Sequence, residues 1–187
     1  MIKVLILFGP SGSGKDTLLK EALKRIPNLH KPIFYTTRPI REGEVNGVNY
    51  NFVSKEEFEA KLLNNEFLEA AVFNGWGYAS SLDNFDEQKV NIVALDEERA
   101  GLLAENLGSK GHCKCFFIKA KDKTRLLRQL KREENPNVDE IIRRYESDKK
   151  DYAYIPFSYH SLINEDRNDL KKNIEILRHE AKTMQSH

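Results

Sequence analysis

Residues 9–15 contain a glycine-rich segment whose spacing suits the binding of phosphate. They read GPSGSGK and fit the pattern G-x-x-x-x-G-K, with Gly9, Gly14 and Lys15 at its fixed positions. Glycines let backbone N–H groups turn toward phosphate oxygens, and the positive end of a following helix adds to the attraction. Lys15 supplies a charge for the β- and γ-phosphates. The segment therefore predicts a nucleotide-binding loop, with contacts expected from Gly9, Ser11, Gly12, Ser13, Gly14, Lys15, Asp16 and Thr17.

The residue after this loop, Asp16, stands where such loops normally carry a Ser or Thr whose hydroxyl binds Mg²⁺. One interpretation is that Asp16 is an acid in the first turn of a helix, where the helix dipole favours it. The other is that its carboxylate binds Mg²⁺ directly or through water, because carboxylates suit this cation. Both interpretations stay open, and Thr17 offers a hydroxyl one position further along.

Two arginines lie close together in the segment TTRPIREGEVNGVNYNF. They are Arg38 and Arg41, and Tyr50 follows in the same segment. Paired guanidinium groups make bidentate contacts with a phosphate dianion. Exposed arginines are ordinarily solvated, but the glycine loop elsewhere in this short chain favours a second phosphate site. We therefore expect this segment to bind a monophosphate that accepts a phosphoryl group.

Apolar runs alternate with helical patterns over most of the chain. Continuous apolar runs indicate parallel strands covered on both faces, at residues 3–8, 90–96 and 113–120, with a further strand at 159–164. Helical periodicity predicts helices at 16–26, 97–108, 123–134, 138–152 and 167–183. Such alternation predicts an α/β fold with a doubly wound, mostly parallel sheet.

The segment from residue 32 to residue 85 breaks this alternation. Short strand-like pieces surround one helical stretch at 54–65, which begins at Ser54 and has Glu57 three residues later, the pattern of a capping box. We expect this segment to form an inserted mixed α+β lobe.

Composition limits the other possibilities. The chain has 187 residues, which suits one compact domain with small lobes, and 30 Lys and Arg nearly balance 29 Asp and Glu. No overall charge therefore favours nucleic acid or a membrane surface as a partner. No apolar run is as long as a membrane span, and the first residues resemble a buried strand more than a signal peptide. We expect a cytoplasmic protein that is a monomer or a homodimer.

The glycine loop and the segment TTRPIREGEVNGVNYNFVS resemble those of the guanylate kinase family, and the resemblance covers nearly the whole chain. It implies transfer of the γ-phosphoryl group of ATP to GMP or dGMP with Mg²⁺, giving ADP and GDP in purine nucleotide metabolism. It also implies a P-loop kinase core at residues 1–31, 86–126 and 148–187, a GMP-binding lobe at 32–85 and a helical lid at 127–147.

The resemblance further implies roles for single residues. Glu69 would accept hydrogen bonds from the guanine N1–H and 2-amino groups, a donor pair that adenine does not offer. The GMP-binding residues would be Arg38, Arg41, Tyr50, Glu69, Tyr78, Ser80 and Asp96. The residues acting in transfer would be Lys15, Arg38, Arg128, Arg132 and Arg144, with Asn164 lining the adenine pocket and Asp16 and Asp96 as candidate Mg²⁺ ligands.

Three positions depart from the family pattern and keep alternatives open. The first is Asp16. The second is Phe34, at a position where the family usually has a serine that binds guanine O6. The third is Glu133, at a position where the family commonly has a glycine. A ribose 1,5-bisphosphate kinase-like enzyme carries a similar GKD loop, but it acts on a sugar phosphate and has little use for the guanine-binding residues Glu69, Tyr78 and Ser80. A non-catalytic guanylate-kinase-like binding module typically lacks the loop and lid groups. GMP phosphorylation is therefore the preferred interpretation.

Overall fold

A parallel β-sheet forms the centre of the protein. The computed structural model describes residues 1–73, 75–132 and 134–186, so the prediction about Glu133 lies outside the described residues. Within them, the strands β1 (Ile2–Phe8), β2 (Leu29–His30), β7 (Val90–Leu95), β8 (Gly111–Lys119) and β9 (His160–Ile163) pair in the order β2-β7-β1-β8-β9. Every pairing in this sheet is parallel.

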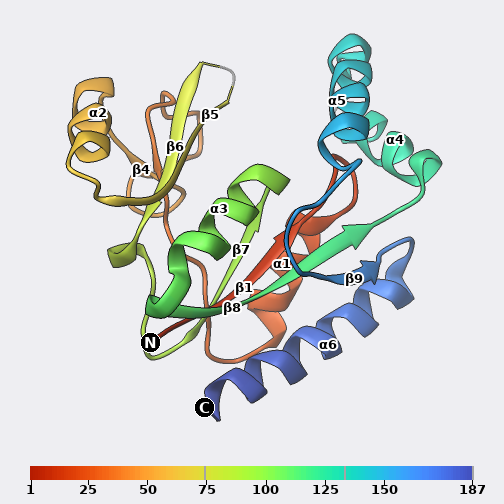
Figure 1. Ribbon diagram of the computed structural model, residues 1–187. Helices are drawn as coiled ribbons and strands as arrows, with labels where there is room; N and C mark the ends of the chain where they lie inside the picture. The colour runs from red at the N-terminus through yellow and green to blue at the C-terminus, as the bar shows by residue number, and fades with distance from the viewer. Residues whose placement is uncertain (74, 133, 187) are drawn as a thin grey trace.

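Strand β1 shows why the apolar runs are continuous. Leu5 and Leu7 pack with the helices α1 (Lys15–Arg25) and α6 (Arg167–Gln185). Ile6 and Phe8 pack on the opposite face with α3 (Glu97–Leu107). All four side chains are fully buried, because a strand covered on both faces has no solvent side that would hold polar residues. The expected doubly wound α/β fold is confirmed (Figure 1).

The remaining helices outside the inserted lobe are α4 (Asp122–Leu130) and α5 (Val138–Asp151). The prediction that α4 runs to residue 134 was wrong, since the helix ends at Leu130. Glu134 and Pro136 follow this end. The helix dipole disfavours an acid at a C-terminus, and the residue before a proline avoids helical geometry.

The inserted lobe has its own mixed sheet, in the order β4-β3-β6-β5. Its strands are β3 (Tyr35–Thr36), β4 (Asn51–Phe52), β5 (Phe67–Phe73) and β6 (Trp76–Ser81), and its helix is α2 (Lys55–Leu63). Ser54 begins this helix as expected, because its side-chain oxygen accepts a hydrogen bond from the Glu57 N–H at 3.1 Å. Strand β6 was not expected from the sequence, and it pairs with β5 as an antiparallel hairpin.

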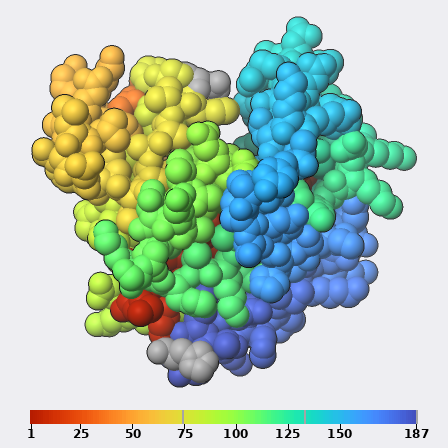
Figure 2. Space-filling model, in the orientation of Figure 1, coloured from red at the N-terminus to blue at the C-terminus, as the bar shows by residue number. Residues whose placement is uncertain are grey.

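The lobe and the α4–α5 pair rise on opposite sides above the carboxyl ends of the parallel strands (Figure 1). The space-filling view shows the surface notched between them (Figure 2). Crossing a membrane would take a longer and more apolar helix than any found in the described residues. The parallel sheet therefore presents its carboxyl edge to a space between two projecting parts, which is where open α/β sheets bind their ligands.

Candidate active site

The P-loop (residues 9–15) joins β1 to α1 at this edge of the sheet. Gly12 and Gly14 have φ angles of 77° and 91°, which favour glycine. A Cβ atom on Gly12 would lie 2.5 Å from the backbone oxygen of Arg125, and one on Gly14 would lie 2.5 Å from Nδ2 of Asn164. Backbone conformation and close packing therefore both require these glycines.

Arg128 and Asn164 hold the P-loop from the side. Arg128 donates through Nη1 to the carbonyl oxygen of Ser13 (3.1 Å) and through Nη2 to that of Asn164 (2.9 Å). Asn164, which is buried, donates through Nδ2 to the same Ser13 oxygen at 2.8 Å. The structure thus brings both predicted residues to the loop, where they bind backbone carbonyls. Their predicted roles toward ATP stay predictions.

Sequence reasoning missed a second clamp on the P-loop, formed by Arg125 and Asp148. Arg125 is 5% exposed and donates through Nε to the Ser11 carbonyl oxygen at 3.0 Å, while its Nη2 pairs with Asp148. Burial raises the pKa of the Asp148 carboxyl, and the Arg125 charge opposes that shift. The available signal was the spacing of Arg125 and Arg128, three residues apart on one face of α4.

A cavity of about 740 Å³ opens beside the P-loop. Its walls come from the start of α1, from α4 and from the loop that joins β9 to α6. The predicted residues that it brings together are Gly12, Gly14, Lys15, Asp16, Thr17, Arg128, Arg132 and Asn164. Arg144 does not line this cavity, and its Nε instead pairs with Glu140 at 2.6 Å.

On the lobe, Arg38 and Arg41 meet through Glu44. Arg38 is 7% exposed and pairs with both oxygens of Glu44, at 2.8 and 3.0 Å. The backbone N–H of Arg41 donates to the same carboxylate at 2.9 Å. The Arg38 guanidinium lies 5.7 Å from the centre of the Tyr50 ring, so these two predicted phosphate-binding residues lie together, and the backbone of Arg41 is joined to Arg38 through Glu44. Glu44 was not singled out from the sequence, although its place in a charged loop was a signal.

Glu69 lies deeper in the lobe with a side chain that is 0% exposed. Both of its oxygens accept hydrogen bonds from Arg99, each at 2.7 Å. Ser80 stands opposite Glu69 on β6, and its buried hydroxyl has no hydrogen-bond partner among the described residues. The Tyr78 ring centre is 5.9 Å from the Arg99 guanidinium carbon. The predicted base-binding residues therefore gather around an arginine that the sequence did not indicate.

Charges from the P-loop side and from the lobe both act on Tyr50. Burial raises the pKa of the Tyr50 phenol, the charge of Asp16 adds to this rise, and the charges of Arg99 and Arg38 oppose it. Asp16 is exposed at the start of α1 and makes no hydrogen bond or ion pair within the described part of the chain. Asp16 is therefore an exposed acid in the lining of the cavity beside the P-loop.

Asp96 follows β7 at the same edge of the sheet, since Leu95 is in register with Phe8 just before the P-loop. One of its oxygens begins α3 by accepting the Arg99 N–H at 2.9 Å. The described residues contain no cluster of three or more His, Cys, Asp or Glu suited to a metal ion. A cation at Asp16 or Asp96 would therefore need further oxygen ligands, and nucleotide phosphates are the usual source for Mg²⁺.

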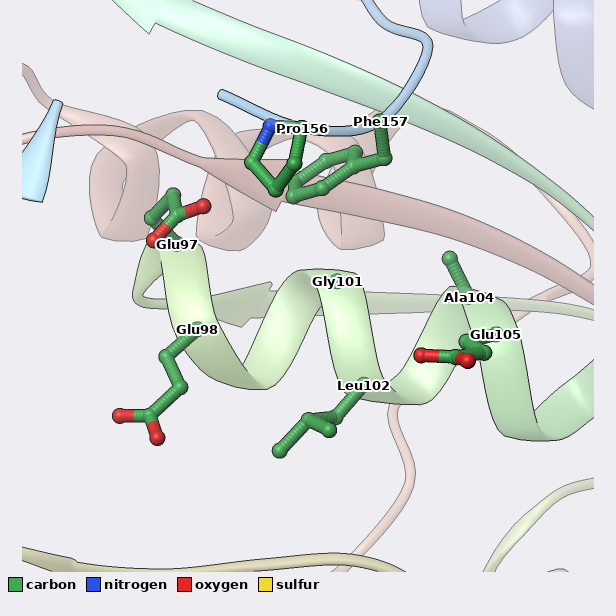
Figure 3. A pocket seen from close by; sticks show the side chains of 8 residues that line it. All are labelled: Glu97, Glu98, Gly101, Leu102, Ala104, Glu105, Pro156 and Phe157. Atoms are coloured by element: carbon green, nitrogen blue, oxygen red, sulfur yellow. The ribbon is translucent and has the colours of Figure 1, made fainter. Parts of the chain in front are cut away.

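A second cavity, of about 720 Å³, lies on the outer side of α3 (Figure 3). Phe157 and Pro156 cover it next to Gly101, and its rim carries Glu97 and Glu98. Burial and the neighbouring charges of Asp96 and Glu98 raise the pKa of the Glu97 carboxyl. A hollow with this charge repels phosphate, which leaves the cavity at the P-loop as the candidate nucleotide site.

A glycine loop at the carboxyl edge of a parallel sheet, faced by a lobe with paired arginines, defines a P-loop phosphate-binding protein. The sequence model described as guanylate kinase matches residues 1–182. The chain therefore belongs to the guanylate kinase family.

Individual relatives agree with this assignment. The chain is 33% identical to a guanylate kinase of Helicobacter hepaticus over 97% of its own length and 92% of that protein. It is 34% identical to a guanylate kinase of Helicobacter pylori over 97% and 87% of the two chains. The crystal structure of a guanylate kinase from Anaplasma phagocytophilum has the same fold, with a TM-score of 0.67 at 24% identity, covering all of this chain and 87% of the other.

Proposed function

We propose that this protein transfers the γ-phosphoryl group of ATP to GMP or dGMP, giving ADP and GDP. Family membership supports this activity, and so do relatives of nearly the same length that are named guanylate kinase. The observation that carries the choice of acceptor is the pair formed by Glu69 and Ser80. The buried Glu69 carboxylate is paired with Arg99, and the buried Ser80 hydroxyl has no hydrogen-bond partner among the residues described. The two residues are register partners in the β5–β6 hairpin.

Guanine fits this pair because of its hydrogen-bonding edge. Its N1–H and 2-amino groups are adjacent donors, and the Glu69 carboxylate offers two acceptor oxygens. Ser80 supplies a hydroxyl that either donates or accepts. Adenine presents an acceptor at N1 and no 2-amino group, so it offers no donor to Glu69, whose oxygens would keep only their hydrogen bonds from Arg99. The N1 acceptor of adenine would then be buried against a carboxylate without a partner, which costs about 1–3 kcal/mol and is enough to favour guanine over adenine.

The phosphate of GMP would bind at the corner formed by Arg38, Arg41 and Tyr50. It is already an anion at neutral pH, so one of its oxygens attacks the γ-phosphorus without a general base. The bond from that phosphorus to the bridging oxygen of ADP breaks as the new bond forms. The work of the protein is then to align two anions and to place positive charge near the transferring group. We assign this task to Lys15, with the lid arginines Arg128, Arg132 and Arg144 as further contributors.

Asp16 and Asp96 suit Mg²⁺, since hard oxygen ligands from one or two carboxylates, completed by phosphates, are its usual set. Both carboxylates lie at the carboxyl edge of the sheet, and Asp16 has no partner among the described residues. Mg²⁺ bound with ATP would neutralise charge on the β- and γ-phosphates.

The sugar-phosphate alternative is weaker for a physical reason. A ribose bisphosphate has no base, so it would leave the buried Glu69–Arg99 pair and the Ser80 hydroxyl without a ligand group to bind. The binding-module alternative is weaker because Lys15 and the glycines that form the cradle are all present.

A coupled assay of ADP release with ATP and Mg²⁺ tests the proposal. Each of GMP, dGMP, AMP, UMP and ribose 1,5-bisphosphate is supplied in turn as the acceptor. We expect turnover with GMP and dGMP and little with AMP or UMP. Turnover of the sugar phosphate with none of GMP would replace the proposed function by the sugar kinase, and silence on every acceptor would favour the binding module.

A further inference from the structure

The guanidinium of Arg38 has two edges that can form hydrogen bonds, and Glu44 occupies one of them. Nη1 donates to Glu44 at 3.0 Å and to the carbonyl oxygen of Pro39 at 2.8 Å, and Nη2 donates to Glu44 at 2.8 Å. Nε makes no hydrogen bond within the described residues, and it is not among their buried polar atoms that lack a partner, so it reaches solvent. The edge formed by Nε and the second N–H of Nη2 is therefore left for a ligand.

Glu44 is held in place by both arginines of the predicted phosphate site. Its side chain is 20% exposed, and its carboxylate accepts hydrogen bonds from Arg38 and from the backbone N–H of Arg41. The backbone N–H of Glu44 donates to the Arg41 carbonyl oxygen at 3.1 Å, across a turn in which Gly43 has a φ angle of 80°. The hydrogen bond from Arg38 lowers the pKa of the Glu44 carboxyl, so Glu44 is ionised at neutral pH. One carboxylate therefore fixes the side chain of Arg38 and the backbone of Arg41.

Two aromatic rings and Glu44 together set the orientation of Arg38. The guanidinium carbon lies 5.7 Å from the ring centre of Tyr50 and 5.5 Å from that of Phe52. The rings restrict the plane of the guanidinium, and Glu44 determines which edge of that plane is free. Without Glu44 the side chain would regain rotamer freedom, and a ligand would have to order it at a cost in entropy.

A phosphate that took the place of Glu44 would be in a poorer position than one at the free edge of Arg38. It would deprive the carboxylate of its three hydrogen bonds from Arg38 and Arg41. It would also lie next to the Pro39 carbonyl oxygen, which repels an anion. Binding at the Nε edge breaks no hydrogen bond within the described residues, and it gives the phosphate two parallel N–H groups.

We infer that Glu44 is a positioning residue that orients Arg38, so that the Nε edge of this arginine binds the phosphate of the acceptor nucleotide. The inference rests on the proposed function, because the acceptor phosphate is the group that Arg38 would bind. Glu44 acts through Arg38 and does not itself touch the ligand. A purely structural Glu44 would support the lobe as a whole, so its loss would weaken every ligand of the lobe equally. Loss of a positioning residue weakens the ligands that carry a phosphate.

Binding calorimetry with GMP and guanosine separates these roles, because guanosine keeps the base and the sugar and lacks the phosphate. In Glu44→Ala the affinity for GMP should fall about tenfold, the size of one weakened charge-assisted hydrogen bond. The affinity for guanosine should stay within about twofold of that of wild type. Glu44→Gln keeps one acceptor oxygen for Arg38, so it should lose only about threefold in affinity for GMP, and it preserves the test if Glu44→Ala does not fold.

Glu42→Ala is the matched control. Glu42 lies in the same loop just before Gly43, is exposed, and makes no hydrogen bond or ion pair within the described part of the chain. Its affinities for GMP and guanosine should equal those of wild type. Both alanine variants remove one negative charge from this loop, so a loss confined to Glu44→Ala is not an effect of overall charge.

Two results would overturn the inference and leave GMP phosphorylation standing. Equal losses for GMP and guanosine in both Glu44 variants would make Glu44 a structural support of the lobe. Unchanged or tighter binding of GMP in Glu44→Ala would show that Arg38 binds phosphate without Glu44, or that the carboxylate competes with the phosphate. The proposed function fails on a different measurement: wild-type protein that does not phosphorylate GMP in the ADP-release assay would remove it, and the inference with it.

Discussion

Asp148 of α5 accepts a hydrogen bond from the backbone N–H of Ser11 in the P-loop, at 3.0 Å. Arg125 pairs with the same carboxylate oxygen and donates to the Ser11 carbonyl oxygen at 3.0 Å. Both backbone groups of Ser11 are therefore held by one ion pair that joins α4 and α5. The position of the P-loop and the packing of these two helices depend on the same contact.

We expect Asp148→Ala to lower the free energy of unfolding by about 3 kcal/mol, because it leaves Arg125 buried without its principal partner. Asp122 still pairs with Arg125, which places the loss near the low end for a broken buried pair. Chemical denaturation measures the change. Asp151→Ala, an exposed acid on the same helix, is the control and should change the free energy by less than about 0.5 kcal/mol. A loss for Asp148→Ala no larger than that of the control would contradict the clamp.

A second prediction concerns the close packing of Gly14. In Gly14→Ala the new methyl group would lie 2.5 Å from Nδ2 of Asn164, so it would displace the hydrogen bond from Asn164 to the Ser13 carbonyl. We expect the affinity for ATP to fall at least about tenfold, and removal of the obstacle in Gly14→Ala/Asn164→Ala to recover part of it. Equilibrium binding of ATP measures both.

Gly108→Ala is the control for Gly14. Gly108 also has a positive φ angle, 40°, but no heavy atom lies within 4 Å of an added Cβ. Backbone strain alone should lower its stability by about 1–2 kcal/mol without changing ATP affinity. If Gly14→Ala and Gly108→Ala lower the affinity for ATP equally, backbone strain and not close packing explains the effect at Gly14.

The fold was predictable because its signals are local. The apolar run of β1, the glycines after it and the periodicity of α1 lie within one short stretch, and each dictates its own backbone geometry. Strand β6 has no such signal, since the sequence WGYASS is rich in small residues and forms a strand only by pairing with β5. Local composition cannot report a pairing of this kind.

The same limit applies to the site. Lys15 belongs to a motif of fixed spacing, so its place was predictable. Arg99 lies in the first turn of a helix, where a solvated arginine is ordinary, and its partner Glu69 is thirty residues away in the chain. Arg125 and Asp148 are likewise separated by most of α4 and α5. Only the tertiary structure brings such charges together.

A third prediction tests the chemistry at Lys15. The side chain makes no hydrogen bond or ion pair within the described residues, so Lys15→Ala should leave the free energy of unfolding nearly unchanged. We expect turnover of GMP to fall on the order of 10²–10³-fold, because a preorganised charge at the transferring phosphoryl group is lost. Lys20→Ala, an exposed lysine on the same helix, should retain full turnover. Activity near that of wild type in Lys15→Ala would refute the assigned role.

The last prediction concerns Asp16 and separates a metal ligand from an acid that merely suits a helix start. As a ligand, Asp16 contributes a carboxylate that alanine cannot replace and that serine replaces with a hydroxyl. The Mg²⁺ concentration for half-maximal turnover should therefore rise in Asp16→Ala, and rise less in Asp16→Ser. As a helix-start acid, Asp16 would affect only stability, by about 0.3–1 kcal/mol in both variants. Titration of Mg²⁺ in the ADP-release assay, after chelation of residual metal, distinguishes the metal ligand from the helix-start acid. An unchanged metal requirement in both variants would leave the helix dipole as the sole reason for the carboxylate.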